Sequence, residues 1–308
     1  MEYANLRTAY GKTLVELGKT DERIVVVDAD LCKSTMHVLF EEAYPQRFFE
    51  MGIAEADMAS VAAGLSLTGK IPFIASFAAF APGRCYDQIR TSICIPGLNV
   101  KICGSSAGLS DFGDGSTHQS IDDIALMRVL PGMHVFSPVD AVQTAQIVRY
   151  MAANDGPMFI RINRNDLPVL TPEDQVFESG KVYTMREGGD VAIFATGIMA
   201  SIALKAADEL AGKGVEAMVL NVPTIKPLDS DAVLEICGKA GAIVTAEEHS
   251  IYGGLGDAIS AIVAPKIAIK HTRVGIQDKF GTSAPNYQEL LEHYGLNPEA
   301  IVQASLGQ

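Results

Sequence analysis

The sequence predicts an α/β protein of two domains, each built on a doubly wound parallel sheet. Three observations predict this fold class. Short apolar runs alternate with amphipathic helical patterns along the chain. Hydrophobic residues make up 48% of the 308 residues, which is enough for two large cores. The 28 glycines and 14 prolines fall between the apolar runs, as turn residues do, and do not form a low-complexity tract.

The first domain is expected over residues 1–170. Leu6, Tyr10 and Leu14 lie on one face of a predicted helix, and Ile24–Val27 is typical of a buried parallel strand. The elements expected after these are a helix over 54–67, a strand over 72–76, a helix over 84–94, a strand over 100–103, a helix over 121–129, a strand over 133–137, a helix over 141–152 and a strand over 158–162.

Residues 171–189 are expected to be a linker, because they combine Pro172, a loose acidic stretch and the turn Gly188–Gly189. A second, smaller α/β domain is expected over residues 190–308. Its predicted elements are a strand over 190–195, a helix ending at 210, a strand over 216–220, a helix ending at 237, a strand over 242–245, a helix after Gly253–Gly254, and further helices at the end of the chain.

Composition excludes several classes of function. The net charge is −13 and no basic cluster is visible, so nucleic acid is not an expected partner. The five cysteines are an odd number without metal-ligand spacing, which favours reduced thiols over disulfides or a zinc site. The chain shows no signal-peptide pattern and no uncharged apolar run of membrane-spanning length. We therefore expect a cytoplasmic protein without a membrane partner.

Glu55 is the first candidate site residue. It lies among Gly52, Ala54 and Ala56, where a loop becomes a predicted helix. A glutamate there can simply stabilise the helix N-terminus. In an apolar setting, the carboxylate can instead gain proton affinity and share a proton with a ligand nitrogen. The segment taken alone favours the structural role.

Phe77 and Phe80 follow the predicted strand 72–76. Aromatic residues at this spacing usually pack in a core. They can also form a wall for a flat heterocycle, because offset stacking is worth about 0.5–1.5 kcal/mol beyond area burial.

The loop 113–119 presents Asp114, Thr117, His118 and Gln119 after the predicted strand 100–103. Open α/β sheets bind ligands at the carboxyl ends of their strands, and a histidine there can move protons near neutral pH. A turn held by local hydrogen bonds is an equally good interpretation.

Cations and hydroxyls form the last group of candidates. Arg7, Ser34 after Asp30, and Arg161 and Arg164 after the last strand of the first domain all fall near predicted sheet edges. Arginine can grip a phosphate through two hydrogen bonds. Each of these residues taken separately is typical of an ordinary surface or interface position.

Together these segments resemble the transketolase family, in order and over nearly the whole chain. The resemblance to that family's middle domain rests on Gly-Ile-Ala-Glu (52–55), Phe-Ala-Ala-Phe (77–80) with Tyr-Asp-Gln-Ile-Arg (86–90), Asp-Gly-Ser-Thr-His-Gln (114–119) and residues 159–168. Glu-Glu-His (247–249) and residues 274–285 are similar to its C-terminal domain. The resemblance implies a thiamine-diphosphate pyrimidine-binding domain followed by a transketolase C-terminal domain.

The resemblance also implies roles at the cofactor. Glu55 would hydrogen-bond the ring nitrogen of the aminopyrimidine of thiamine diphosphate and promote the imino form that activates the cofactor. Phe77 and Phe80 would hold the pyrimidine ring, with Asp30 nearby.

For the substrates, the implied reaction transfers a two-carbon ketol unit from a ketose phosphate such as xylulose 5-phosphate to an aldose phosphate, as in the pentose phosphate pathway. His118 would help to deprotonate the donor hydroxyl, and Asp114 would contact a substrate hydroxyl. Arg7, Ser34 and Arg164 fall where the family grips the sugar phosphate.

The family forms its active site between two domains on different chains, and one of these domains binds the diphosphate and Mg²⁺. This sequence resembles only the other parts, which implies a separate N-terminal subunit that holds Mg²⁺ and an α2β2 heterotetramer. Gly113-Asp114-Gly115 looks like the metal motif, but it runs directly into Ser-Thr-His-Gln, and the next asparagine, Asn154, ends a predicted helix. We therefore expect no metal site on this chain.

The resemblance has departures. Many transketolases flank the key glutamate with Arg and His, where this chain has Ala54 and Ala56. Ser106 falls near a position where many carry another histidine. Pro82–Gly83 adds a residue before Arg84, which leaves the third aromatic of the pyrimidine wall unassigned.

Three alternative functions stay open. A 1-deoxyxylulose-5-phosphate synthase shares Gly-Ile-Ala-Glu and a similar Thr-His-Gln loop, but Phe-Ala-Ala-Phe and residues 122–128 look more like transketolase. The β subunit of a 2-oxoacid dehydrogenase has the same pair of domains and usually lacks the Thr-His-Gln loop. A non-catalytic homologue would be expected to lose Glu55 or His118, and both are present.

Overall fold

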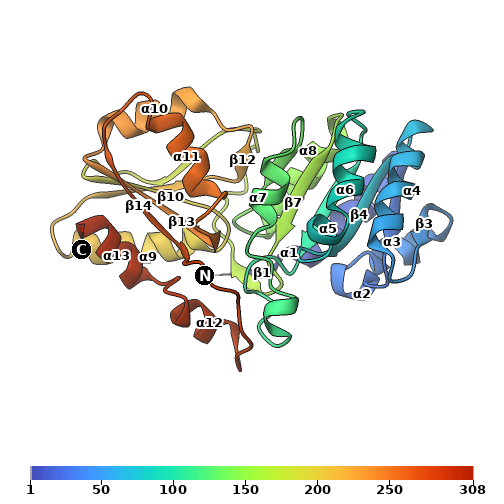
Figure 1. Cartoon of the computed structure of the whole chain (residues 1–308), viewed down its shortest axis with the longest axis horizontal. Helices are drawn as coiled ribbons and strands as arrows, with labels where there is room; N and C mark the ends of the chain where they lie inside the picture. Colours follow the sequence, from blue (N-terminus) through green and yellow to red (C-terminus); the bar gives the residue numbers. More distant parts are fainter. Residues whose placement is uncertain (1, 308) are drawn as a thin grey trace.

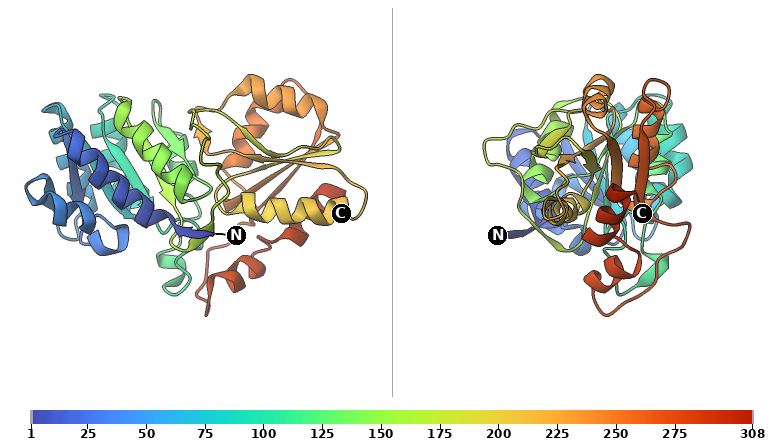
Figure 2. Two further views of the ribbon diagram at one scale, coloured as in Figure 1. Left: turned by 180° about the vertical axis from the view of Figure 1, so that it is seen from behind. Right: turned by 90° about the vertical axis from the view of Figure 1, so that its left-hand side faces the viewer.

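The computed structural model describes residues 2–307 and shows two α/β domains lying side by side (Figure 1). The predicted fold class is confirmed, because each domain has a mainly parallel sheet covered by helices on both faces (Figure 2). Within the described residues, no helix combines the length and the apolar character needed to cross a bilayer.

The first sheet has seven strands in the order β12-β6-β7-β5-β4-β2-β3. Their bounds are β2 (Ile24–Asp28), β3 (Phe48–Glu50), β4 (Ile71–Phe77), β5 (Lys101–Ser105), β6 (His134–Phe136), β7 (Met158–Ile162) and β12 (Thr224–Lys226). All neighbours are parallel except β12, which pairs antiparallel with β6. β12 comes from the second half of the chain, so the two halves share this sheet.

Helices from different parts of the first half cover the two faces of this sheet. α1 (Leu6–Thr20), α3 (Val38–Ala43) and α8 (Ala141–Ala153) pack on one face. α4 (Glu55–Leu67), α5 (Ala81–Arg84), the π-helical segment η2 (Ile89–Cys94) and α7 (Asp123–Arg128) pack on the other. The helix expected over 84–94 is therefore divided into α5, α6 (Tyr86–Gln88) and η2. The other elements here are β1 (Tyr3–Asn5), α2 (Cys32–Thr35), η1 (Pro45–Arg47), η3 (Gly115–Thr117) and β8 (Asp166–Pro168), and β1 pairs antiparallel with β8.

The second sheet has five strands in the order β14-β13-β10-β11-β9. Its strands are β9 (Tyr183–Arg186), β10 (Val191–Ala195), β11 (Ala217–Asn221), β13 (Ala242–Ser250) and β14 (Lys270–Ile276). Its helices are α9 (Met199–Ala211), α10 (Ser230–Lys239), α11 (Leu255–Val263), α12 (Tyr287–His293) and α13 (Pro298–Leu306). β9 lies within the range expected to be a linker and pairs antiparallel with β11.

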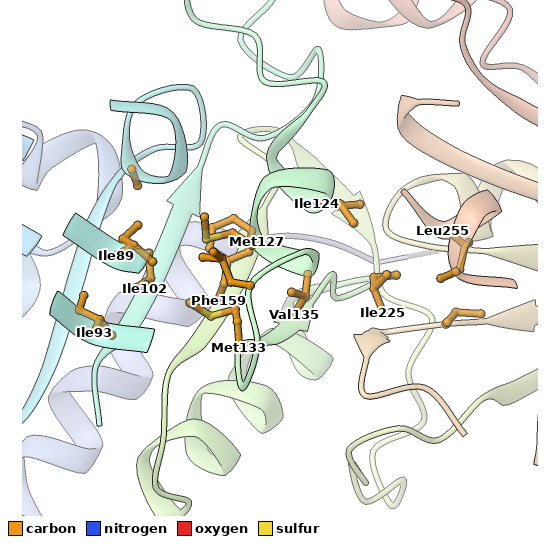
Figure 3. Close-up of a cluster of buried hydrophobic side chains, with 14 of the residues drawn as sticks. Ile89, Ile93, Ile102, Ile124, Met127, Met133, Val135, Phe159, Ile225 and Leu255 are labelled. Carbon is orange, nitrogen blue, oxygen red and sulfur yellow. The ribbon is translucent and has the colours of Figure 1, made fainter. Parts of the chain in front are cut away.

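A continuous apolar cluster joins the two domains (Figure 3). Ile124 and Val135 of the first domain and Ile225 and Leu255 of the second all belong to it, and all are at most 2% exposed. Burial of this kind contributes about 25 cal/mol per Å² of apolar surface. The shared cluster and the shared sheet fix the second domain against the first.

This arrangement determines where a site can form. The carboxyl ends of β2, β4, β5 and β7 meet at one edge of the first sheet, because these strands are parallel neighbours. The loops that leave this edge hold most of the residues selected from the sequence. Open parallel sheets bind their ligands at such an edge.

Candidate active site

Glu55 is the first residue of α4, and its side chain is buried. Ala54 precedes it at the N-cap and makes no side-chain hydrogen bond to the helix. Glu55 and Asp57 are the two acidic residues of the first turn, where negative charge stabilises a helix. Oε1 of Glu55 accepts a hydrogen bond of 2.7 Å from Nη1 of Arg84. The guanidinium of Arg84 also lies over the ring of Phe80, 4.1 Å from its centroid.

Phe77, Phe80 and His118 form an aromatic cluster at the same edge. Phe77 ends β4, and Phe80 directly precedes α5. The two phenyl rings stack with centroids 5.9 Å apart. The ring of His118 meets both edge-on, at 5.9 Å from Phe77 and 5.1 Å from Phe80. The structure thus brings together residues that are far apart in the sequence.

The loop 106–119 carries His118 and Asp114 away from β5. Asp114 is exposed and immediately precedes η3, and Gly115 takes a φ of +76°, which a residue with a side chain rarely adopts. Nδ1 of His118 lies 2.9 Å from Oγ1 of Thr117. This contact restrains the imidazole, which is partly exposed beside the phenylalanines.

Two arginines, Arg7 and Arg164, lie close to each other, and Arg164 also lies near Phe77. Arg164 has its guanidinium 5.8 Å from the centroid of the Phe77 ring, and its Nη1 donates to Oδ2 of Asp111 at 2.6 Å. Arg7 donates through Nη1 to the carbonyl oxygen of Ser34 at 3.0 Å. Partial burial and the charge of Arg164 lower the pKa of Arg7, so the two guanidinium groups are close neighbours.

Asp111 has a pKa above its usual value. Burial is the main cause, the nearby carboxylate of Asp114 adds to it, and Arg164 acts in the opposite direction. The Arg7–Arg164 pair therefore faces a buried acid, which offsets part of its positive charge.

The backbone amide of Asp30 is connected to the loop before Glu55 through the side chain of Glu50. It has a φ of +61° just after β2, and its amide nitrogen donates to Oε1 of Glu50 at 2.8 Å. The amide of Gly52 donates to the same oxygen at 2.8 Å. Glu50 therefore links the loop that holds Asp30 with the loop that leads to Glu55.

Arg161 does not join the arginine pair. Its side chain is buried and bonds both oxygens of Asp123, at 2.7 Å and 3.1 Å, and the carbonyl oxygen of Glu248. The hydrogen bonds of Arg161 are therefore already made inside the protein, and its role is structural. Arg164, three residues later, keeps its partly exposed position.

Three residues of the site were not selected from the sequence: Arg84 as the partner of Glu55, Asp111 as the partner of Arg164, and Glu50 as the link between two loops. No local pattern marks them, because each contact joins segments that only the tertiary fold brings together. Among residues 2–307, no group of three or more His, Cys, Asp or Glu side chains is arranged to hold a metal ion.

Comparison with known protein families gives two matches. The family model described as "Transketolase, pyrimidine binding domain" matches residues 2–169. The model described as "Transketolase, C-terminal domain" matches residues 180–301. The two matches together cover most of the chain, in the order that the sequence motifs indicate.

Individual proteins are similar over nearly the full length of the chain. The SqwH subunit of a 6-deoxy-6-sulfo-D-fructose transketolase from Clostridium sp. (strain MSTE9) is 44% identical over 97% of this chain and 93% of its own. Transketolase from Rattus norvegicus is 36% identical over 98% of this chain and 48% of its own. A solved structure titled "Split gene transketolase, inactive beta4 tetramer" is 46% identical, with a TM-score of 0.90 over 99% of this chain and 98% of that one.

Proposed function

The chain belongs to the transketolase family, and on this basis we propose that it is the C-terminal subunit of a two-chain, thiamine-diphosphate-dependent transketolase. The proposed reaction moves a two-carbon ketol unit from a ketose phosphate of the xylulose 5-phosphate type to an aldose phosphate. The observation that carries the proposal is the aromatic cluster of Phe77, Phe80 and His118 beside the buried carboxylate of Glu55.

The residues at this edge fit the pyrimidine end of the cofactor. Thiamine diphosphate, when bound, supplies a nucleophilic carbon and an electron sink for cleaving a carbon–carbon bond. Phe80 is partly exposed and offers aromatic surface for a flat heterocycle, and it stacks on the buried ring of Phe77. We propose that Phe77 and Phe80 hold the pyrimidine, with Asp30 on the neighbouring loop. The buried carboxylate of Glu55 would hydrogen-bond a ring nitrogen and share a proton with it.

We assign the substrate roles to the loop of Asp114 and His118 and to the arginine pair near Phe77. His118 would accept a proton from the donor hydroxyl, and Asp114 on the same exposed loop would contact a substrate hydroxyl. Arg7, Ser34 and Arg164 would bind the anionic end of the sugar. Nε of Arg7 is buried and has no hydrogen-bond partner among the described residues, which supports a polar ligand at this position.

We propose that residues 1–170 form the pyrimidine-binding domain, 171–189 the connection and 190–308 the C-terminal domain. The missing part of the site, with Mg²⁺ and the cofactor diphosphate, would come from a separate N-terminal subunit in an α2β2 heterotetramer. Two similarities support this assembly. SqwH is named a subunit, and the similar split-gene structure is described as inactive when four copies assemble alone.

The arginine pair also fits a donor with a sulfonate in place of the phosphate. The name of SqwH gives a sulfonated ketose, 6-deoxy-6-sulfo-D-fructose, as the substrate of that enzyme. A sulfonate and a phosphate are both anions that an arginine pair can bind. A donor panel for this chain therefore needs xylulose 5-phosphate, a sulfonated ketose and pyruvate.

The test is reconstitution. The pure chain is assayed with ribose 5-phosphate, thiamine diphosphate, Mg²⁺ and each donor, without and then with a candidate N-terminal subunit. We expect ketol transfer only in the mixture. Activity of the chain alone would contradict the two-subunit proposal, and use of pyruvate without ketol transfer would replace the transketolase assignment with one of its pyruvate-using rivals.

A further inference from the structure

The loop 106–119 is held from outside its own domain. Leu109 is fully buried in the apolar cluster of the second domain, among side chains of α9, α12 and α13. Its amide nitrogen donates to Oε1 of Glu248 on β13 at 2.7 Å. Gly108 beside it has a φ of +66°, and a Cβ at that position would lie 2.3 Å from the carboxyl carbon of Glu248. The start of the loop is thus fixed in the second domain.

The middle and the end of the loop contact one short segment of the second domain, residues 281–284, which we call the clasp. The carbonyl oxygen of Phe112 accepts from the amide of Ala284 at 2.9 Å. Nε2 of Gln119, a buried side chain, donates to the carbonyl oxygens of Thr282 at 2.9 Å and Asp111 at 3.2 Å. These contacts lie on both sides of Asp114 and His118.

The clasp fits closely against the loop. A Cβ added at Gly281 would lie 1.7 Å from Oε1 of Gln119 and 3.1 Å from Cδ2 of Leu109. A Cβ at Gly115, beside Asp114, would lie 3.2 Å from the amide nitrogen of Ser283. In Figures 1 and 2 the green loop extends below the first sheet beside the red segment that precedes α12.

We propose that the clasp of the second domain positions the loop that carries Asp114 and His118 for catalysis. The proposal rests on the proposed function for the roles of those two side chains. Ordering a free loop costs backbone entropy at every residue, and the clasp lets folding of the second domain order the loop in advance. A displacement of about 1 Å at a catalytic group can cost about 100-fold in rate.

The decisive variant is Gly281→Ala, because its methyl group would meet Gln119. We expect faster amide hydrogen exchange in residues 112–119 of the isolated chain. In the reconstituted enzyme we expect kcat/KM for the donor to fall by about 10- to 100-fold, with the dissociation constant for thiamine diphosphate unchanged. Gly238→Ala on α10 is the matched control, because its added Cβ meets nothing within 4 Å.

A second variant, Gln119→Ala, distinguishes loss of the clasp contacts from general misfolding. Gln119→Ala removes the hydrogen bonds to the clasp without adding bulk, and in a Gly281→Ala background it also makes room for the methyl group. We expect the double variant to be no worse than Gln119→Ala alone, which is the non-additivity of residues in direct contact.

Unchanged amide hydrogen exchange in residues 112–119 of Gly281→Ala would contradict the proposed role of the clasp. The same holds if the losses of kcat/KM in the two single variants simply add in the double variant. If wild-type chain and partner give no ketol transfer at all, the proposed function fails, and the exchange experiment still tests the clasp by itself.

Discussion

Nη1 of Arg84 lies 2.7 Å from Oε1 of Glu55, and the same guanidinium covers the ring of Phe80. The carboxylate is buried, whereas the arginine side chain is half-exposed. A buried carboxylate loses most of its hydration, and a charged hydrogen bond offsets part of that cost. Arg84 therefore holds the side chain that we propose as the proton partner of the cofactor.

Replacing Arg84 with Met should destabilise the isolated chain by about 1–3 kcal/mol, because the change leaves the buried carboxylate of Glu55 unpaired. Urea unfolding measures the effect. Arg90→Met, at an exposed position six residues later, is the control and should cost less than about 0.5 kcal/mol. In a Glu55→Gln background, the cost of Arg84→Met should shrink, and equal costs in both backgrounds would show that the pair contributes nothing.

Glu55→Gln should preserve cofactor binding and reduce turnover of the reconstituted enzyme by about 100-fold or more, because an amide cannot share a proton with a ring nitrogen. Calorimetric titration with thiamine diphosphate and a steady-state assay measure the two quantities separately. Full activity in this variant would remove Glu55 from the proposed mechanism. Loss of binding with normal kcat at saturation would give it a role in affinity only.

The parts of the fold that the sequence predicted are those with local signals. The strands Ile24–Asp28 and Met158–Ile162 are uniform apolar runs, and α1 and α9 show clear helical periodicity. β12 has only three residues and joins the sheet of the other domain. No pattern within three residues can indicate a partner strand so far away in the chain.

In the candidate site, too, some residues are indicated by the sequence and others only by the tertiary structure. The motifs and the family resemblance selected Glu55, Phe77 and His118, and the structure places them around one edge of the sheet. Arg161 and Arg164 are the same residue type three positions apart, and the family resemblance placed only Arg164 at the sugar phosphate. Only the tertiary structure shows that Arg161 points to the buried Asp123, while Arg164 lies at the site with Asp111.

Asp111→Asn should strengthen binding of a doubly charged phosphate. The substitution removes a buried negative charge 2.6 Å from Arg164, so the arginine pair gains net positive charge. We expect KM for a phosphorylated donor to fall by about 3- to 10-fold, which corresponds to about 0.7–1.4 kcal/mol. KM for the same ketose without a phosphate should change less. Arg164→Ala is the opposing variant and should raise KM for the phosphorylated donor. An equal change for both donors in Asp111→Asn would contradict an electrostatic role.

Glu248 predicts a pH-dependent stability. It lies between the domains beside Arg161, Asn163, Tyr287 and the amide of Leu109, and burial raises its pKa to about 7 from 4.5. Between about pH 4.5 and 7, the folded chain therefore keeps a proton on Glu248 that the unfolded chain has already released. The stabilisation is fully present below about pH 4.5 and is lost as the pH rises to about 7, with a total on the order of 3 kcal/mol.

Glu248→Gln isolates this effect, because an amide does not titrate. His271, whose pKa is lowered to about 4 mainly by burial, gives the opposite slope between about pH 4 and 6.5, so the raw curve of the wild type mixes both groups. The quantity to measure is the difference in unfolding free energy between wild type and Glu248→Gln, by urea unfolding from pH 5 to 8. We expect the wild type to lose stability relative to the variant as the pH rises from 5 to about 7, and this loss to level off as the pH approaches 8. Parallel curves over the whole range would mean that Glu248 is ionised in the folded chain and that its pKa is not raised.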